Sequence, residues 1–78
     1  MKTTRYFEAM RVRPDRAAIK DEWIVAVIEH PEKESIQADG RFRRWAKIPE
    51  AEGRVLRVVL LADGETVRNA FFDRGFET

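Results

Sequence analysis

The spacing of the hydrophobic residues changes once along this chain, close to Pro31. Before that proline, apolar side chains recur every three or four positions, which is the spacing of a helix that packs one face against a core. This stripe comprises Trp23, Ile24, Val27, Ile28 and His30. Asp21 and Glu22 begin the segment, where negative charge suits the helix dipole, and Pro31 disfavours helical geometry just before it. The pattern predicts a helix over residues 21–30.

After residue 33 the hydrophobic positions alternate, which is the pattern of strands. The predicted strands are residues 33–39, 41–48, 54–61 and 66–72. Asp-Gly turns at 39–40 and 63–64 separate them, because glycine accepts the positive φ angle that hairpin turns require. The segment 54–61 is the most apolar, so we expect it at the centre of a sheet.

These elements predict a single small α+β domain over residues 1–78, with one main helix packed on a four-stranded antiparallel β-meander. The loop 49–53 joins the second and third strands. The segment 5–13 alternates only loosely, and it is compatible with either a first strand or a short helix.

Composition limits the chemistry. The chain holds 15 basic and 14 acidic residues, so only the distribution of charge can indicate a nucleic-acid surface. It has no cysteine, which excludes disulfides and a cysteine nucleophile. One histidine and isolated glycines provide neither a metal-ligand set nor a phosphate loop, so we expect no metal and no cofactor. No segment approaches the ~20 apolar residues that span a bilayer, and we expect a cytoplasmic protein without a membrane partner. So small a core also suits a homodimer.

The stretch GRFRRWAKIP, residues 40–49, gathers four cations around a tryptophan. Because successive side chains of a strand point to opposite faces, Arg41, Arg43, Trp45 and Lys47 share one face, opposite the apolar one. The same alternation places Arg57 of the next strand on that face. Arginine forks match phosphate geometry, and an exposed indole stacks on an unpaired base, so this face is a candidate RNA surface.

Other interpretations of this face remain open. Glu32, Glu34 and Asp39 are close enough along the chain to pair with the cations across the strands, which would leave an ordinary solvated face. A tryptophan among cations is also typical of a protein-interface anchor. In the last strand the alternation is ambiguous, and Asn69 points toward Arg57 only if the odd-numbered residues share the basic face.

Two further features have alternatives. Phe71, Phe72 and Phe76 exceed what one strand face buries, so either Phe76 folds back over the sheet or it docks a partner. Histidine is a common general base, so His30 is a candidate for that role, but its place at the end of the predicted helix favours a structural one.

The succession of a helix ending in EHP, then DGRFRRWAKI, RVLRVVLL and TVRNAFFDRGF resembles a family of small bacterial and cyanobacterial proteins akin to the compact BrnT and RelE toxins of toxin–antitoxin pairs. The resemblance covers about residues 11–76. It implies an α+β fold with a three- or four-stranded antiparallel sheet. It also implies a metal-independent endoribonuclease that cuts messenger RNA and is silenced by a small antitoxin protein.

In such ribonucleases, cationic side chains stabilise the charge that develops when a 2′-hydroxyl attacks the adjacent phosphorus. The catalytic cations that the resemblance implies are Lys47, Arg57 and Arg74. The implied RNA-binding set is Arg41, Arg43, Trp45 and Asn69. The alternative function is a non-catalytic α+β binding module that engages RNA or a protein partner through the same face.

Overall fold

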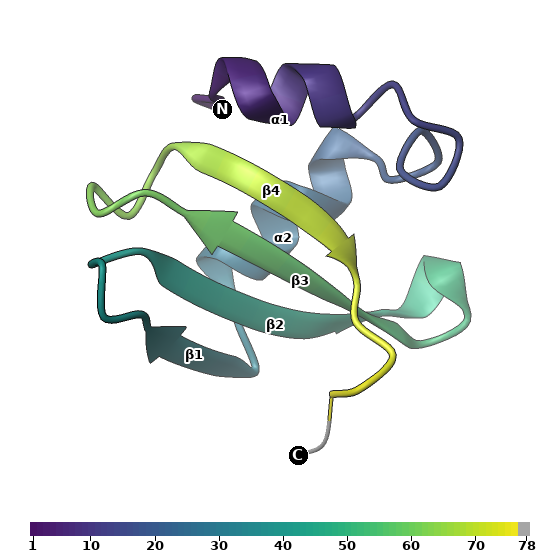
Figure 1. Ribbon diagram of the computed structural model, residues 1–78. Coiled ribbons are helices and arrows are strands. Elements are labelled where there is room, and N and C mark those ends of the chain that lie inside the picture. The colour runs from purple at the N-terminus through teal and green to yellow at the C-terminus, as the bar shows by residue number, and fades with distance from the viewer. Residues whose placement is uncertain (77–78) are drawn as a thin grey trace.

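The computed structural model describes residues 1–76, which form two helices and a four-stranded antiparallel sheet (Figure 1). The helices are α1 (Arg5–Met10) and α2 (Asp21–Glu29), and a 3-10 turn, η1, spans Pro49–Ala51. The strands are β1 (Lys33–Ile36), β2 (Phe42–Ile48), β3 (Arg54–Leu60) and β4 (Val67–Phe72). They lie in the sheet in sequence order, which confirms the predicted antiparallel meander. The expectation of one main helix was incomplete, because α1 is a second one.

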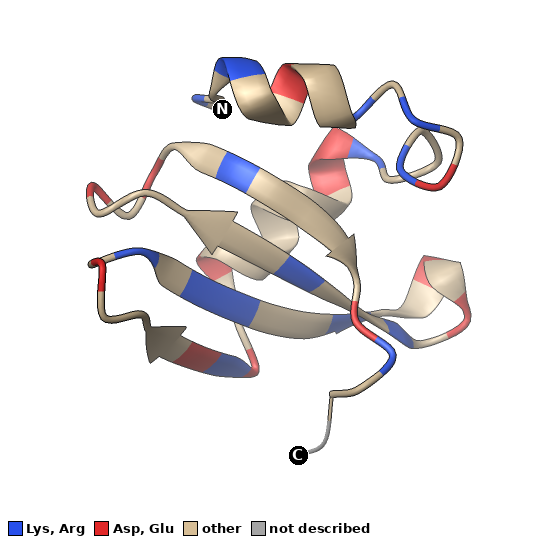
Figure 2. Cartoon of the chain, in the orientation of Figure 1, with Lys and Arg blue, Asp and Glu red and all other residues tan. Residues whose placement is uncertain are grey.

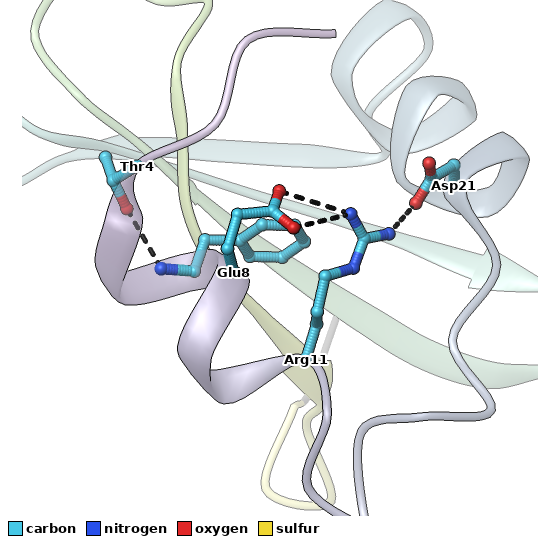
Figure 3. Close-up of polar contacts among 5 residues, drawn as sticks. Thr4, Glu8, Arg11 and Asp21 are labelled. Atoms are coloured by element: carbon cyan, nitrogen blue, oxygen red, sulfur yellow. Dashed lines mark hydrogen bonds and ion pairs between the residues drawn. The ribbon is translucent and has the colours of Figure 1, made fainter.

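The loosely alternating segment near the N-terminus forms helix α1. The Thr4 hydroxyl caps it by accepting a 3.0 Å hydrogen bond from the Phe7 backbone N–H, and the Phe7 side chain is buried. Arg11 then links the two helices, since its guanidinium pairs with Glu8 at 3.3 Å and with Asp21 at the start of α2 (Figure 3). This arrangement holds α1 beside β4, away from the broad face of the sheet (Figure 1).

Helix α2 covers one face of the sheet, behind the strands in Figure 1. Ile24 and Val27 are its buried residues, and Trp23 and Ile28 pack partly against the same core, as the helical spacing predicts. The inclusion of His30 in that stripe was wrong. His30 follows the last helical residue, its backbone leaves the helical conformation, and its side chain is exposed.

The sheet face beneath α2 is the core. Leu56, Val58 and Leu60 of β3 are fully buried there, which confirms the apolar face that the alternation predicts. The first Asp-Gly turn is formed as expected, with Gly40 at φ 88°. A residue with a Cβ would be strained at that φ angle, because the Cβ would crowd the backbone.

A β-bulge in β4 explains the ambiguous alternation of the last strand. Val59 pairs with Asn69, whereas Leu60 pairs with Val67, so Arg68 is an extra residue on β4. The bulge turns Val67 into the core, where it is fully buried, while Asn69 stays on the opposite face. The alternative in which the odd-numbered residues share the basic face therefore holds for Asn69 and Phe71 and fails for Val67. Asn69 lies opposite Val59 and not opposite Arg57.

Candidate nucleic-acid interface

The sheet face that α2 leaves uncovered is turned toward the viewer in Figure 1. Strand alternation brings Arg43, Trp45 and Lys47 of β2 and Arg57 of β3 to this face, because their neighbours along each strand belong to the core. With Asn69 of β4, which pairs with Val59 on the same face, five of the predicted site residues share one surface. We call it the open face.

A row of alternating cations and aromatic rings crosses the open face at right angles to the strands. Register places Lys33, Trp45, Arg57 and Phe71 directly beside one another on the four strands. The Lys33 ammonium lies 5.6 Å from the Trp45 ring centroid, and the Arg57 guanidinium lies 5.5 Å from the same ring and 5.3 Å from Phe71. Arg16 closes the row from the loop between the helices, 5.2 Å from the Phe71 ring. We call these five residues the cation–aromatic row.

A second row runs parallel to it, one pleat away. It consists of Ser35, Arg43, Val59 and Asn69. Arg43 reaches back to 5.9 Å from the Trp45 ring, and Arg16 donates a 2.7 Å hydrogen bond to the Asn69 amide oxygen. Arg16 therefore contacts both rows, and Asn69 fixes its guanidinium.

Three buried polar atoms of this face lack a hydrogen-bond partner among the described residues. They are Ser35 Oγ, Arg43 Nε and Arg57 Nε. Buried polar groups are nearly always paired, and each exception needs an explanation. Here all three lie on the open face, beneath its outermost atoms.

Trp45 is buried, and the expectation of an exposed indole was wrong. Only 7% of its surface is accessible. Its cover is the segment 73–76 that follows β4, and not the helix. The indole N–H donates a 2.9 Å hydrogen bond to Asp73 Oδ2, and the Phe76 ring lies 5.9 Å from the indole at 39°. Phe76 therefore folds back over the sheet, one of the two alternatives that its sequence position left open.

The other predicted site residues do not converge on Trp45. Lys47 is exposed on the open face, one pleat beyond Trp45. Arg41 precedes β2 and pairs with Asp39 at 3.6 Å. Arg74 is exposed in the segment 73–76, whose Asp73 N–H is bonded to Val55 at the start of β3. Arg41 and Arg74 therefore lie near opposite ends of β3, about 20 Å apart at ~3.3 Å per residue, too far to act on one phosphate.

The acids that the solvated-face interpretation invokes bind groups other than the open-face cations Arg43, Lys47 and Arg57. Glu34 pairs with Arg44, on the core side of β2, and Arg44 also donates a 3.1 Å hydrogen bond to the Ile28 carbonyl at the end of α2. Glu32 instead accepts the backbone N–H of Lys47 at 2.7 Å. Within residues 1–76, no carboxylate lies within ion-pairing distance of Arg43 or Lys47, so these two cations keep their charge for a ligand.

Charge is segregated between the two layers of the fold. Strand β2 carries three cations, β3 two and β4 one, and none of these strands carries an acid. Helix α2 carries three acids and no cation. Figure 2 shows the result, with blue bands on the central strands and red at the helix ends and turns. A chain of net charge +1 thus presents a basic sheet and an acidic helix.

A groove of about 620 Å³ adjoins the row where the segment 73–76 leaves the sheet. Its lining includes Arg16, Arg54, Phe71, Asp73, Arg74 and Phe76. Arg54 lies over the Phe72 ring, with its guanidinium carbon 4.1 Å from the ring centroid. The groove continues the same chemistry of guanidinium groups against aromatic rings.

Sequence reasoning missed Lys33, Phe71, Arg16 and Asp73 as members of this surface. Lys33 has a signal in the sequence, because a hairpin closed at residues 39–40 sets β1 beside β2 and brings Lys33 next to Trp45. Arg16 and Asp73 have none, since both reach the site from loops whose paths depend on tertiary packing.

Within residues 1–76, no three His, Asp or Glu side chains gather as a metal site. No described helix is both long enough and apolar enough to cross a bilayer. Comparisons of the chain with protein-family models, curated proteins and solved structures gave no match.

Proposed function

We propose that this protein binds single-stranded RNA on its open face. The observation that carries the proposal is the cation–aromatic row, in which Lys33, Arg57 and Arg16 alternate with Trp45 and Phe71 across all four strands. Proteins that bind single strands combine a basic surface, which follows the phosphates, with flat groups on which bases stack. Bases stack on the planar guanidinium groups of arginine in addition to aromatic rings.

The division of charge supports the same function. A strand approaching the molecule is attracted to the basic sheet and repelled by the acidic helix α2, so the field orients the ligand before contact. Arg43 and Lys47, which no carboxylate among the described residues neutralises, are the first phosphate contacts on this path. An open sheet face with an extended basic row suits an unpaired strand better than a duplex, whose bases are stacked away from the protein.

Binding is favoured over the endoribonuclease that the toxin-like resemblance implies. Cleavage needs a proton acceptor beside the attacked phosphate. The carboxylate beside Arg57 is Asp73, which is already bonded to the Trp45 indole. His30 follows the last residue of α2, the helix that packs on the opposite face of the sheet. Lys47, Arg57 and Arg74 therefore serve as binding cations in this proposal, and an antitoxin partner is needed only if the protein cleaves RNA.

The test is fluorescence anisotropy with a labelled 12-nucleotide RNA, at several salt concentrations. We compare the wild type with the double variant Arg43→Gln/Arg57→Gln. The matched control is Arg5→Gln/Arg13→Gln, which removes the same charge from exposed residues of α1 and the following turn. We expect at least tenfold weaker binding for the first variant and a salt slope smaller by about 1.4, since each lost phosphate contact on a single strand contributes ~0.7.

Equal weakening by the two double variants would reduce the proposal to nonspecific charge attraction and contradict it. Absence of binding by the wild type at low salt would also contradict it. Gel analysis of the same mixtures scores cleavage. If the wild type shortens the RNA and the variant without Arg57 does not, the function is RNA cleavage and not binding alone.

A further inference from the structure

The segment 73–76 makes two contacts with Trp45, one polar and one aromatic. Asp73 Oδ2 accepts the indole N–H at 2.9 Å and lies 3.8 Å from Arg57 Nη1. Three residues later, the Phe76 ring packs at 5.9 Å from the indole. Asp73 Oδ1 accepts the Gly75 N–H at 3.0 Å, and this turn sets the spacing between the carboxylate and the ring.

A nucleotide carries the same two kinds of group as this segment, because its phosphate is an anion like the Asp73 carboxylate and its base is a flat ring like Phe76. An indole N–H and a guanidinium that converge on one oxygen bind a phosphate oxygen as they bind a carboxylate. A base stacks on an indole as a phenyl ring does. We infer that Trp45 and Arg57 form a binding site for one nucleotide of an RNA strand, and that Asp73 and Phe76 occupy this site in place of the phosphate and the base.

The charge around the indole supports a ligand more anionic than Asp73. Three cations surround Trp45, since Lys33 and Arg43 lie 5.6 Å and 5.9 Å from its ring and Arg57 lies 5.5 Å from it. Among residues 1–76, Asp73 is the one carboxylate within ion-pairing distance of these cations, and it reaches only Arg57. Together these three side chains carry more N–H donors than one carboxylate can accept. A strand brings several phosphate oxygens to these donors, whereas the carboxylate brings two.

One backbone hydrogen bond joins the described part of this segment to the sheet. Its Asp73 backbone N–H is anchored by a 2.9 Å hydrogen bond to the Val55 carbonyl, but Arg74 and Gly75 are exposed. Rotation of the chain after residue 73 therefore moves Phe76 off the indole, and a turn of the Asp73 side chain releases the indole N–H, while the backbone bond to Val55 and strand β4 stay in place. The inference rests on the proposed function, and it adds that the strand must displace the segment 73–76, so the measured affinity is lowered by the fraction of time for which the site is covered.

The test uses Trp23→Phe as the background, so that Trp45 is the single tryptophan. Into it we place Asp73→Asn, which keeps an acceptor for the indole but removes the charge, or Phe76→Ala, which removes the ring. Glu29→Gln is the matched control, because it removes one negative charge from α2. We expect Asp73→Asn and Phe76→Ala each to bind the 12-nucleotide RNA at least threefold more tightly than the background, and the control to leave its affinity unchanged. Saturating RNA should quench Trp45 emission in all of them.

The outcomes separate this inference from the proposed function. If RNA binding depends on Arg57 but neither Asp73→Asn nor Phe76→Ala tightens it, the nucleotide site is wrong and the open face still binds RNA. If RNA binds neither the background protein nor either variant, both are wrong. The last measurement replaces the RNA by an oligoglutamate peptide of equal charge and follows Trp45 emission. Quenching of Trp45 by the peptide and not by RNA would overturn the inference and assign the site to an acidic protein segment.

Discussion

Replacing Trp45 by alanine tests whether the indole is structural, because an exposed and a buried tryptophan differ widely in what their removal costs. Removing a buried tryptophan side chain destabilises a protein by about 3–5 kcal/mol, whereas surface substitutions stay within about 0.5 kcal/mol. Trp45 is 7% exposed, but part of its cover is the segment 73–76, which can settle into the space left behind. We therefore expect the lower end of that range, about 3 kcal/mol.

Urea unfolding followed by circular dichroism measures this difference. With a slope of about 1 kcal/mol per molar urea for a domain of this size, the midpoint falls by about 3 M. Val12→Ala is the control, since Val12 is 75% exposed, and its midpoint should move by less than about 0.5 M. A free energy of unfolding for Trp45→Ala within 0.5 kcal/mol of the wild type would refute the burial of the indole.

A milder variant keeps the test informative if Trp45→Ala does not fold. Trp45→Phe retains most of the ring and removes the N–H that Asp73 accepts. We expect a loss of about 1 kcal/mol, which is the usual contribution of one hydrogen bond. An unchanged free energy of unfolding would show that the contact with Asp73 does not form in solution.

Three further predictions concern the fold around the site. Arg44→Gln loses the ion pair with Glu34 and the bond to the Ile28 carbonyl, and we expect it to lower the free energy of unfolding by about 1 kcal/mol, measured in urea. Gly40→Ala places a Cβ at φ 88°, and we expect a cost of about 1–2 kcal/mol in the same assay. Hydrogen bonds from a turn hydroxyl and two backbone amides lower the pKa of Asp63 to about 2 from its ordinary 3.8. Its contribution to stability is therefore complete above pH 3.8 and lost as the pH falls through 2, and an acid titration of the melting temperature should be flatter for Asp63→Asn.

The strands were the predictable part of this fold, for a physical reason. A period of two is a local property, and the Asp-Gly turns fix where each strand ends, so Trp45 and Arg57 are placed on one face from sequence alone. The bulge at Arg68 was not predictable in this way. The bulge allows Val67 to pack into the core. It shifts the alternation of β4, and no residue pattern in that segment of the sequence indicates the shift.

The cover over Trp45 was the main error in the predicted site. Indole exposure was inferred from the basic residues around it, but Asp73 and Phe76 reach it from 28 and 31 positions further along the chain. Neither contact follows from periodicity, because the path of a loop after its last strand depends on what it meets. Arg16, which closes the cation–aromatic row and binds Asn69, was missed for the same reason.

The most direct test of RNA binding on the open face is a map of amide chemical shifts by ¹H–¹⁵N NMR during titration with the 12-nucleotide RNA. We predict that the largest shifts fall on Arg43, Trp45, Arg57 and Phe71 and on the Trp45 indole N–H, while the amides of α2 stay in place. Shifts confined to α2, or no shifts at low salt, would contradict RNA binding by this face.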